Sequence, residues 1–449
     1  MRPPYPDIQS RLTYRPVSGM LDSMDPGQRA VVSAPSGTTS PVPAAPAIVL
    51  IGSRPVGPAP SAVWLTAAGW AEAAARHFGQ VLMVTSAGRV DPSEARGVAT
   101  TPKPQAEGSP RRRRRLGVLR DLAKDMRELV RALRFTFTAN RAAPRGTTAS
   151  LVWQHHEPWL WAGWWLARRC HAPWVLFVDA PVVWESRAWG VRRPGWGRML
   201  ERFGEVPQLR RADVVACVSE SVATEVRRLG APSDRVVVTP CSVDVTRYDL
   251  SDEAKDTTRR TLGLEGRVVV GWLGSFRRFH GIDMLLESYE RARTSYPKLA
   301  LLLIGDGPER RPVEEDVRRR GLKDVVLTGM VHHDDVPRNL GAVDIAVIID
   351  PGSAQWHYSP LKLREYMAAG LAIIAPDSGQ VRDAVRDEHE ALLVPPGDGT
   401  ALATAISALA GDASHRARLG AAARARSEGD GGWDRQLASA LTVAEPRSG

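Results

Sequence analysis

Short apolar runs alternate with helical stretches through the second half of this sequence, and this alternation limits the folds open to the chain. The apolar runs cover residues 267–273, 299–304, 325–327, 343–349 and 371–375. Apolar residues of an amphipathic helix recur at i, i+3, i+4 and i+7. Between the first two runs this spacing occurs at Ile282, Leu285, Leu286 and Tyr289. Apolar strands separated by helices predict a parallel sheet covered by helices on both faces.

The first half of the sequence shows the same alternation. Its apolar runs lie at 47–51, 80–85, 151–153, 174–178, 213–218 and 235–239. A helical stretch at 62–78 separates the first two of these runs. A chain of 449 residues exceeds the roughly 250–300 residues at which single cores stop growing. We therefore expect an α/β protein with two Rossmann-like, doubly wound domains that face each other across a cleft.

Composition suggests where these domains begin and end. Residues 1–45 are rich in Pro, Gly and Ser and poor in large apolar residues, so we expect a disordered tail there. We assign 46–245 to the first domain and 246–430 to the second, with the polar stretch 251–266 as the connection between them. We expect residues 431–449 to pack back on the first domain.

Charge and cysteine content narrow the setting of the protein. The net charge of +10 comes from arginine and favours anionic partners, unless it only reflects an arginine-rich composition of the whole chain. Cys170, Cys217 and Cys241 lack metal-ligand spacing, as expected in a reducing compartment. No apolar run approaches the roughly 20 residues of a membrane span, and the N-terminus lacks a basic-then-apolar leader pattern. We therefore expect a cytoplasmic protein.

A basic amphipathic stretch lies between the second and third apolar runs. After five arginines at 111–115, apolar residues recur at helical spacing, namely Leu116, Leu119, Leu122, Met126, Leu129, Val130 and Leu133. Such a helix either lies on an anionic membrane surface or turns its apolar face to the core and its basic flank to solvent. The arginine run alone predicts only salt-sensitive, non-specific contact with nucleic acid, so we expect no specific nucleic-acid partner.

Tryptophans are concentrated between residues 153 and 196. We expect most of them in the core, because the ring buries a large apolar area. Trp184 and Trp189 are expected on loops, where the alternative is stacking on a sugar ring or on lipid.

The stretch 359–370 has the pattern of a helix that ends just before a buried strand. Ser359 suits the N-cap, Pro360 suits the first turn and Gly370 suits a left-handed stop. The backbone N–H groups at such a helix start attract anions.

Charged residues in this helix predict its ligand. Lys362 and Arg364 stand in the first turn, where a cation opposes the helix dipole, so we expect an anionic ligand there. Glu365 follows them and can accept hydrogen bonds from hydroxyl groups. A phosphate at the helix start beside a polyol predicts a nucleotide-sugar site.

Three glycine-rich loops follow other strands of the second half and are expected at the same sheet edge. They are 274–281 with Gly274, Arg277 and Arg278; 305–308 with Gly305 and Gly307; and 328–331 with Val331. The glycines permit close backbone approach, the arginines suit phosphate, and the third loop offers a small apolar surface for a flat base.

Together these motifs resemble a known family. The second half is similar to the nucleotide-sugar domain of the family 4 retaining glycosyltransferases, whose GT-B fold has two Rossmann-like domains. The matching segments are 274–283, 303–308, 328–331, 359–370, 377–381, 392–398 and Trp433, and the first half matches more loosely at 212–219 and 239–244. The pattern resembles a subset of the family with Phe/Trp-His-Gly and Ser-Pro-Leu-Lys motifs.

The resemblance implies roles for individual residues. Glu365 matches the glutamate that hydrogen-bonds the nucleotide ribose. Backbone amides around Pro360 and Leu361 are implied contacts of the diphosphate, and Lys362 supplies positive charge together with an arginine of the first loop.

Two positions depart from the family pattern. His357 stands eight residues before Glu365, where the family's first glutamate contacts the donor sugar, and His280 replaces a lysine. Because the same subset of the family shows both replacements, we keep both histidines as donor-site candidates.

A histidine pair is the candidate in the first half. His155 and His156 follow a strand and are similar in place to the histidine near the reacting sugar. A neutral imidazole there can accept a hydroxyl hydrogen bond. The sequence leaves open which of the two faces the cleft.

The resemblance implies retaining transfer of a sugar from a nucleoside-diphosphate sugar to a hydroxyl of a glycan or lipid-linked acceptor. No Asp-x-Asp pair occupies the usual cleft loop, so we expect neither a metal ion nor a cofactor. Family precedent implies that the leaving phosphate deprotonates the acceptor. The alternative is a catalytically silent homologue that binds a nucleotide sugar or a partner enzyme.

Overall fold

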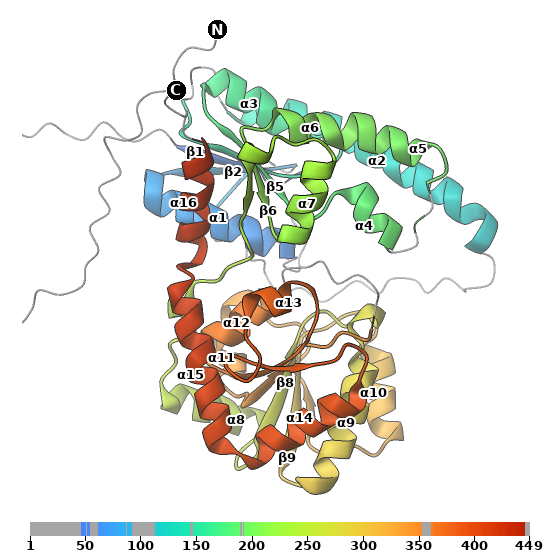
Figure 1. Cartoon of the computed structure of the whole chain (residues 1–449), viewed down its shortest axis with the longest axis vertical. Helices are drawn as coiled ribbons and strands as arrows, with labels where there is room; N and C mark the ends of the chain where they lie inside the picture. Colours follow the sequence, from blue (N-terminus) through green and yellow to red (C-terminus); the bar gives the residue numbers. More distant parts are fainter. Residues whose placement is uncertain are drawn as a thin grey trace, which may run out of the picture.

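The structure of the chain is a computed structural model. It describes residues 46–50, 52–53, 62–86, 88–91, 113–143, 146, 148–188, 191, 193–352 and 361–444. Within these residues the chain forms two α/β domains, one above the other in Figure 1, each built on its own sheet. The two-domain α/β prediction is therefore confirmed, while the expected tail at 1–45 lies outside the described residues.

The described part of the first domain contains a seven-stranded sheet in the order β3-β2-β1-β4-β5-β6-β7. Its strands are β1 (Ala47–Leu50), β2 (Val81–Thr85), β3 (Gly88–Val90), β4 (Val152–His155), β5 (Trp174–Val178), β6 (Val214–Cys217) and β7 (Val236–Val238). All neighbours pair in parallel except β2 and β3, which are antiparallel. All five residues of β5 are buried, as expected for a strand that is covered on both faces.

Helices lie above and below this sheet in Figure 1. They are α1 (Ala62–Phe78), α2 (Arg113–Ala142), α3 (Ala162–Cys170), α4 (Val182–Ala188), α5 (Trp196–Met199), the π-helix η4 (Leu200–Glu205), α6 (Val206–Arg211), α7 (Glu220–Arg228) and the short η5 (Ser233–Arg235). Trp153 and Trp174 are buried in the core, as predicted. Trp184 lies on α4 and not on a loop, and Trp189 lies outside the described residues.

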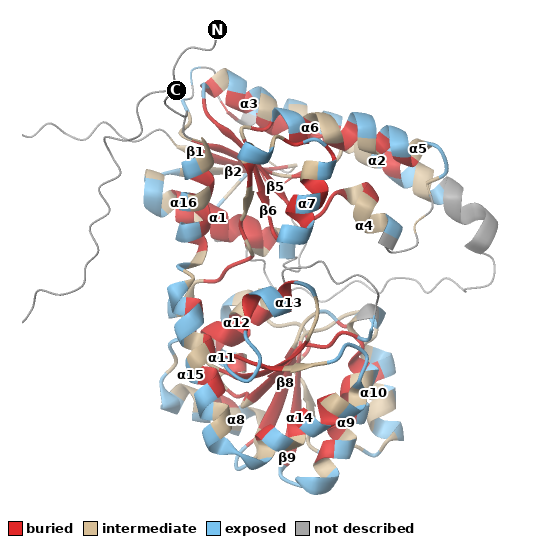
Figure 2. Ribbon diagram, viewed as in Figure 1, coloured by how far each residue is buried: buried red, intermediate tan, exposed pale blue. Residues whose placement is uncertain are grey.

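The second domain has a parallel sheet in the order β10-β9-β8-β11-β12-β13. Its strands are β8 (Val268–Leu273), β9 (Leu299–Ile304), β10 (Val325–Leu327), β11 (Ile345–Val347), β12 (Ala372–Pro376) and β13 (Leu392–Val394). The surrounding helices are η6 (Val245–Tyr248), α8 (Asp252–Leu262), η7 (Arg278–His280), α9 (Ile282–Ser295), α10 (Arg310–Arg319), η8 (His333–Asp335), α11 (Val336–Leu340), α12 (Leu361–Ala368), α13 (Gly379–Ala384), α14 (Gly399–Gly411) and α15 (Ala413–Gly429). Figure 2 shows the buried strands at the centre and the exposed outer sides of the helices.

The prediction that 251–266 is only a connection is wrong, because most of it is helix α8. Ser251 caps this helix by accepting the N–H of Ala254, and Arg259 pairs with Asp344 at 2.8 Å, next to β11. Caps and ion pairs hold α8 in place without an apolar stripe, so hydrophobic periodicity did not reveal it.

The chain returns from the second domain to the first between α15 and α16 (Gly432–Ala444), as Figure 1 shows. The ring of Trp433 packs on Trp70 of α1 with centroids 6.3 Å apart, in the space left by Gly69. Arg76 of α1 also pairs with Asp434 at 2.8 Å. Helix α16 therefore completes the core of the first domain.

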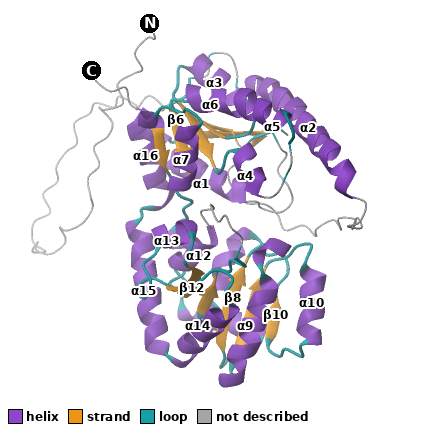
Figure 3. Ribbon diagram, turned by 45° about the vertical axis from the view of Figure 1, so that its right-hand side comes forward, coloured by secondary structure: helices purple, strands orange, loops and turns teal. Residues whose placement is uncertain are grey.

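The carboxyl ends of the two sheets face each other where the domains meet. Gln380, at the start of α13 after β12, donates from Nε2 to the carbonyl oxygen of Val218, which follows β6, at 2.8 Å. Figure 3 shows the two domains and the loops between them from a second side. Ligands of open α/β sheets bind beyond the carboxyl ends of the strands, so the candidate site belongs at this junction.

Candidate functional site

The glycine-rich loops of the second domain meet at the carboxyl edge of its sheet, as predicted. Gly305, after β9, forms a bridge with Gly329, after β10. The backbone N–H of Phe276, after β8, donates to the carbonyl oxygen of Asp306 at 2.9 Å. The three loops therefore form one continuous surface.

Contacts between these loops explain their glycines. A Cβ on Gly305 would lie 2.0 Å from the carbonyl oxygen of Gly274, and one on Gly307 would lie 2.5 Å from that of Phe276. The sequence predicts close approach of these glycines to a ligand, whereas the structure shows close approach of the loops to one another. Val331, half-buried, packs against the core of the second domain.

Replacing Gly305 by alanine is expected to destabilise the protein by about 3 kcal/mol, because φ is +129° and backbone atoms cannot move away from the new methyl group. Gly321→Ala is the matched control. Its φ is +62° but the space around it is open, so we expect a loss of only about 1 kcal/mol. Urea denaturation of both variants measures the difference, and equal losses would contradict the loop contact.

Lys362 lies in the first turn of α12 against the first of these loops. Its Nζ is 4.7 Å from the ring centroid of Trp272 and 3.2 Å from the position of a Cβ on Gly274. Burial lowers the pKa of Lys362 to about 8, and the neighbouring Glu365 opposes that lowering. Lys362 is thus a poorly solvated cation that an approaching anion would stabilise.

The first loop brings further basic residues to Lys362. His280 packs edge-on against Trp272 with ring centroids 5.7 Å apart. Burial, and then the charges of Lys362 and Arg277, lower the pKa of His280 to about 3. At neutral pH the positive charges here therefore belong to Lys362 and to the exposed Arg277 and Arg278, while His280 is neutral.

Glu365 lies one turn further along α12 and is only 4% exposed. The hydroxyl of Tyr248 donates to its Oε1 at 3.4 Å, and Nδ1 of His333 lies 3.9 Å from the same oxygen. Burial raises the pKa of Glu365 to about 7, against the lowering effect of Lys362. This carboxyl group therefore changes charge near neutral pH.

The other residues predicted for this helix do not contribute a described side chain to the surface formed by the three loops. Arg364 does not meet the loops, because its guanidinium pairs with Asp430 at 2.6 Å, so the prediction that it attracts an anion is wrong. His357 and Pro360 lie outside the described residues. Leu361 opens the described helix, and its side chain packs against the cores of both domains.

On the first domain, a histidine and a carboxylate pair at the carboxyl ends of neighbouring strands. Nε2 of His155, at the end of β4, lies 2.6 Å from Oδ2 of Asp179, which follows β5. The Asp179 side chain is 41% exposed and that of His155 is 12% exposed. His156 is buried, its ring nitrogens have no hydrogen-bond partner among the described residues, and burial lowers its pKa to about 3. The structure thus places His155, and not His156, beside an exposed carboxylate.

The next residue, Glu157, contacts the loop that follows β1. Its carboxylate accepts hydrogen bonds from the backbone N–H of Ser53 at 3.2 Å and from the Ser53 hydroxyl at 2.5 Å. A Cβ on Gly52 would lie 2.2 Å from Glu157 Oε1. Glu157 therefore fixes the start of the loop that follows β1.

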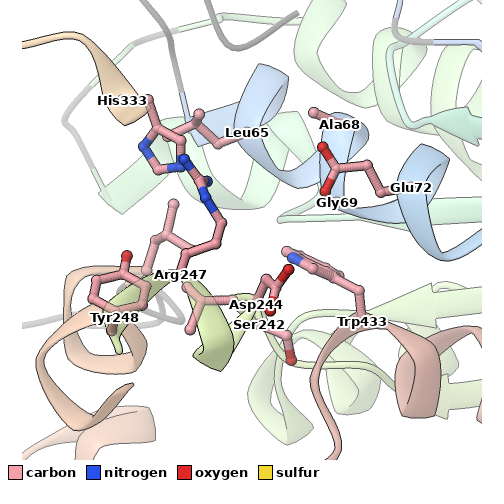
Figure 4. Close-up of a pocket in the computed structure, with 12 residues that line it drawn as sticks. Leu65, Ala68, Gly69, Glu72, Ser242, Asp244, Arg247, Tyr248, His333 and Trp433 are labelled. Atoms are coloured by element: carbon pink, nitrogen blue, oxygen red, sulfur yellow. The ribbon is translucent and has the colours of Figure 1, made fainter. Parts of the chain in front are cut away.

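A small cavity lies at the hinge between the domains (Figure 4). Its volume is about 30 Å³, enough for one or two water molecules and too small for a sugar ring. Figure 4 shows Leu65 and Gly69 of α1 on one side of it and Arg247 and Tyr248 on the other. The same Tyr248 bonds Glu365, so the hinge and the candidate site share a residue.

The sequence-based predictions do not include three residues at these contacts, namely Tyr248, His333 and Asp179. Asp179 directly follows the apolar run 174–178, so its position at a strand end could have indicated it. Tyr248 lies 117 positions from Glu365, and no sequence spacing connects them.

Known protein families match both domains. The family model described as Glycosyl transferases group 1 matches residues 267–412, and the one described as Glycosyl transferase 4-like domain matches residues 61–242. These ranges contain every described strand except β1.

Curated relatives of the chain are also glycosyltransferases. A D-inositol 3-phosphate glycosyltransferase from Xylanimonas cellulosilytica is 30% identical over 308 residues, which cover 64% of this chain and 70% of the relative. A 2-deoxystreptamine N-acetyl-D-glucosaminyltransferase from Streptomyces fradiae is 35% identical over 221 residues, or 48% of this chain and 51% of the relative. The chain thus spans about half the length of several curated relatives that it matches.

Solved structures share the arrangement of the two domains. HepE of Anabaena, solved with UDP and glucose, has a TM-score of 0.63 at 17% identity and covers 89% of this chain and 99% of its own. Sucrose-phosphate synthase of Thermosynechococcus elongatus has a TM-score of 0.62 at 24% identity, with 89% and 97% covered. The predicted GT-B fold is confirmed, and the chain belongs to the glycosyl transferases of group 1.

Proposed function

We propose that this chain transfers a sugar from a nucleoside-diphosphate sugar to an acceptor hydroxyl with retention of configuration, without a metal ion or cofactor of its own. The observation that carries this proposal is the position of Lys362 between the buried Glu365 and His280, which Arg277 also approaches, at the sheet edge that faces the first domain. Cations suit a diphosphate, and a carboxylate suits the ribose hydroxyls. The UDP bound to HepE supports this assignment.

In the proposed reaction the bond between the anomeric carbon and the diphosphate oxygen breaks as the acceptor oxygen bonds to the same carbon. The acceptor proton passes to the departing diphosphate on the same face. Lys362 and Arg277 would stabilise the negative charge that develops there, and preorganised charge of this kind usually contributes more to catalysis than any other single effect. Because its pKa is about 8, Lys362 is mostly charged at neutral pH, and a bound anion would stabilise that charged form further.

The first domain would hold the acceptor near His155 and Asp179. Two relatives are named for cyclic polyols, D-inositol 3-phosphate and 2-deoxystreptamine. An acceptor panel should therefore contain cyclitols as well as the glycans and lipid-linked sugars that the sequence suggests.

Nucleoside diphosphates are expected to raise the melting temperature by roughly 5 to 10 °C at a hundredfold excess over Kd, because a ligand that binds only the folded state stabilises it by about 2.7 kcal/mol. A thermal-shift panel of UDP, GDP, ADP and their sugars identifies the base. The rise in melting temperature should shrink above about pH 8, where Lys362 loses its charge. The variant Lys362→Ala should lose most of this rise at any pH. Lys323→Ala, on the same domain, is the control.

Turnover separates an enzyme from a silent binding protein. With the best donor and each acceptor we expect release of the nucleoside diphosphate, and the anomeric coupling of the product in NMR reports retention. A thermal shift without diphosphate release from any acceptor would favour the silent homologue. No shift with any nucleotide would reject the site itself.

A further inference from the structure

Helix α2 carries two apolar rows, and the protein covers only one of them. Ala132, Phe135 and Ala139 face inward and belong to the core of the first domain. On the opposite side an apolar row continues over three turns, and its exposed fractions are 52% for Met126, 49% for Val130, 48% for Leu133 and 72% for Phe137. The spacing i, i+4, i+7, i+11 places these four side chains along one outward line.

This arrangement contradicts the interpretation in which the predicted apolar face packs on the core, and leaves the membrane-surface interpretation open. The predicted apolar face included Met126, Val130 and Leu133, and the structure leaves these residues exposed. Leu116 and Leu119 fall among side chains that are not described. The core contact uses a different side of the helix, so the outward row is available to a partner. Figure 2 shows exposed residues alternating with buried ones along α2.

A basic row borders the apolar one. Arg127, Arg134 and Arg141 recur every seven residues, so they project from one side of the helix, and all three are exposed. No ion pair joins them to a carboxylate within the described part of the chain. The acidic Asp125 points away from this row and is buried against Arg193 at 2.7 Å and Trp196 at 2.9 Å.

Most of the exposed large apolar side chains of the described residues lie on α2 or on elements next to it. Of the eight, seven belong to α2, α3, α5 and η4, and these seven are Met126, Val130, Leu133, Phe137, Trp165, Met199 and Phe203. Arg169 of α3 bonds the backbone of Asn140 at 2.9 Å, and Trp196 of α5 bonds Asp125, so these elements contact α2 directly. An exposed apolar concentration of this kind marks an interaction site.

We propose that this face of the first domain docks peripherally on an anionic lipid bilayer. An outward apolar row beside a row of arginines matches the acyl boundary and the charged head groups of such a surface. A second copy of the chain fits less well, because a two-fold contact through this face would bring the arginine rows of both copies together. Within the described ranges, no helix has the length and apolar character to cross the bilayer.

Flotation of the full chain tests the proposal. The chain should float with phosphatidylcholine vesicles that contain phosphatidylglycerol and not with phosphatidylcholine alone. The double variant Arg127→Gln, Arg134→Gln should bind the anionic vesicles about 25-fold more weakly, because each basic residue near such a surface contributes about fivefold. Leu133→Ser with Phe137→Ser should weaken binding by at least about tenfold.

The control is Arg291→Gln with Arg311→Gln, which removes the same charge from exposed arginines of the second domain. It should float like the unmodified chain, and circular dichroism melts confirm that all variants fold. No flotation with anionic vesicles, or equal losses in the control, would overturn the proposal. A dimer in light scattering that Leu133→Ser with Phe137→Ser dissociates would assign the face to a second copy instead.

Discussion

Replacing Glu365 by glutamine is expected to weaken binding of nucleoside diphosphates and their sugars by about 10²- to 10³-fold, because hydrogen bonds to a charged acceptor contribute about 1.5–3 kcal/mol each. The side chain of glutamine keeps the shape of Glu365 and can still accept the bond from Tyr248. Its amide lacks the negative charge that the ribose hydroxyls would meet. Isothermal titration with the nucleotide selected by the thermal-shift panel measures the loss.

The same substitution is expected to stabilise the unliganded protein. The pKa of Glu365 rises from 4.5 in the unfolded chain to about 7 in the folded one. Between these values the folded state holds a proton that the unfolded state has released, so the unmodified protein loses stability as pH rises through this window. A glutamine side chain does not titrate, so it contributes no such loss of stability as pH rises. The variant should therefore gain about 2 to 3 kcal/mol at about pH 8 and nothing below about pH 4.5.

Glu390→Gln is the matched control for both effects. Glu390 is also buried, at 1% exposed, in the second domain, but its hydrogen bonds and ion pair with Arg386 lower its pKa. A lowered pKa contributes stability that is present at neutral pH and is lost as pH falls, so this variant should lose stability at neutral pH. Its nucleotide affinity should not change. If Glu365→Gln binds nucleotide normally, the ribose assignment fails.

The architecture could be predicted from the sequence because it depends on a local pattern. Apolar runs such as 174–178 and 299–304 became the buried strands β5 and β9, and helix α1 begins and ends at the predicted residues. Helix α8 was missed because a cap and the pair of Arg259 with Asp344 hold it, and neither leaves an apolar period. Local pattern thus predicted the elements that hydrophobic burial stabilises.

The candidate site could be predicted only in part. Its glycine-rich loops and Lys362 follow from strand ends and helix starts. The contact of Tyr248 with Glu365 lies within the second domain but joins residues 117 positions apart, so it depends on how the whole domain folds. Arg364 was misassigned for a similar reason, because its partner Asp430 comes from the far end of the chain. Charge in a helix predicts a ligand only when no distant residue neutralises it.

The pair of His155 and Asp179 carries the second large expected effect, on the acceptor side. Asp179 is the more exposed partner, so we expect its carboxylate to accept a hydrogen bond from a hydroxyl in the cleft while His155 fixes its position. Asp179→Asn should lower kcat/KM for the acceptor by about 10²- to 10³-fold. The nucleotide Kd should stay unchanged, because the second domain holds the nucleotide.

Variants of the two neighbouring histidines decide whether this pair acts as a unit. His155→Ala should lose activity to a similar extent, and the double variant with Asp179→Asn should lose little more, because groups that act together are strongly non-additive. His156→Leu is the control, since His156 is buried, neutral and without a hydrogen-bond partner among the described residues. Leucine there should leave turnover unchanged and cost no stability, because it removes an unsatisfied buried polar group. Full activity of Asp179→Asn, or loss of activity in His156→Leu alone, would move the acceptor site away from the 2.6 Å contact between His155 and Asp179.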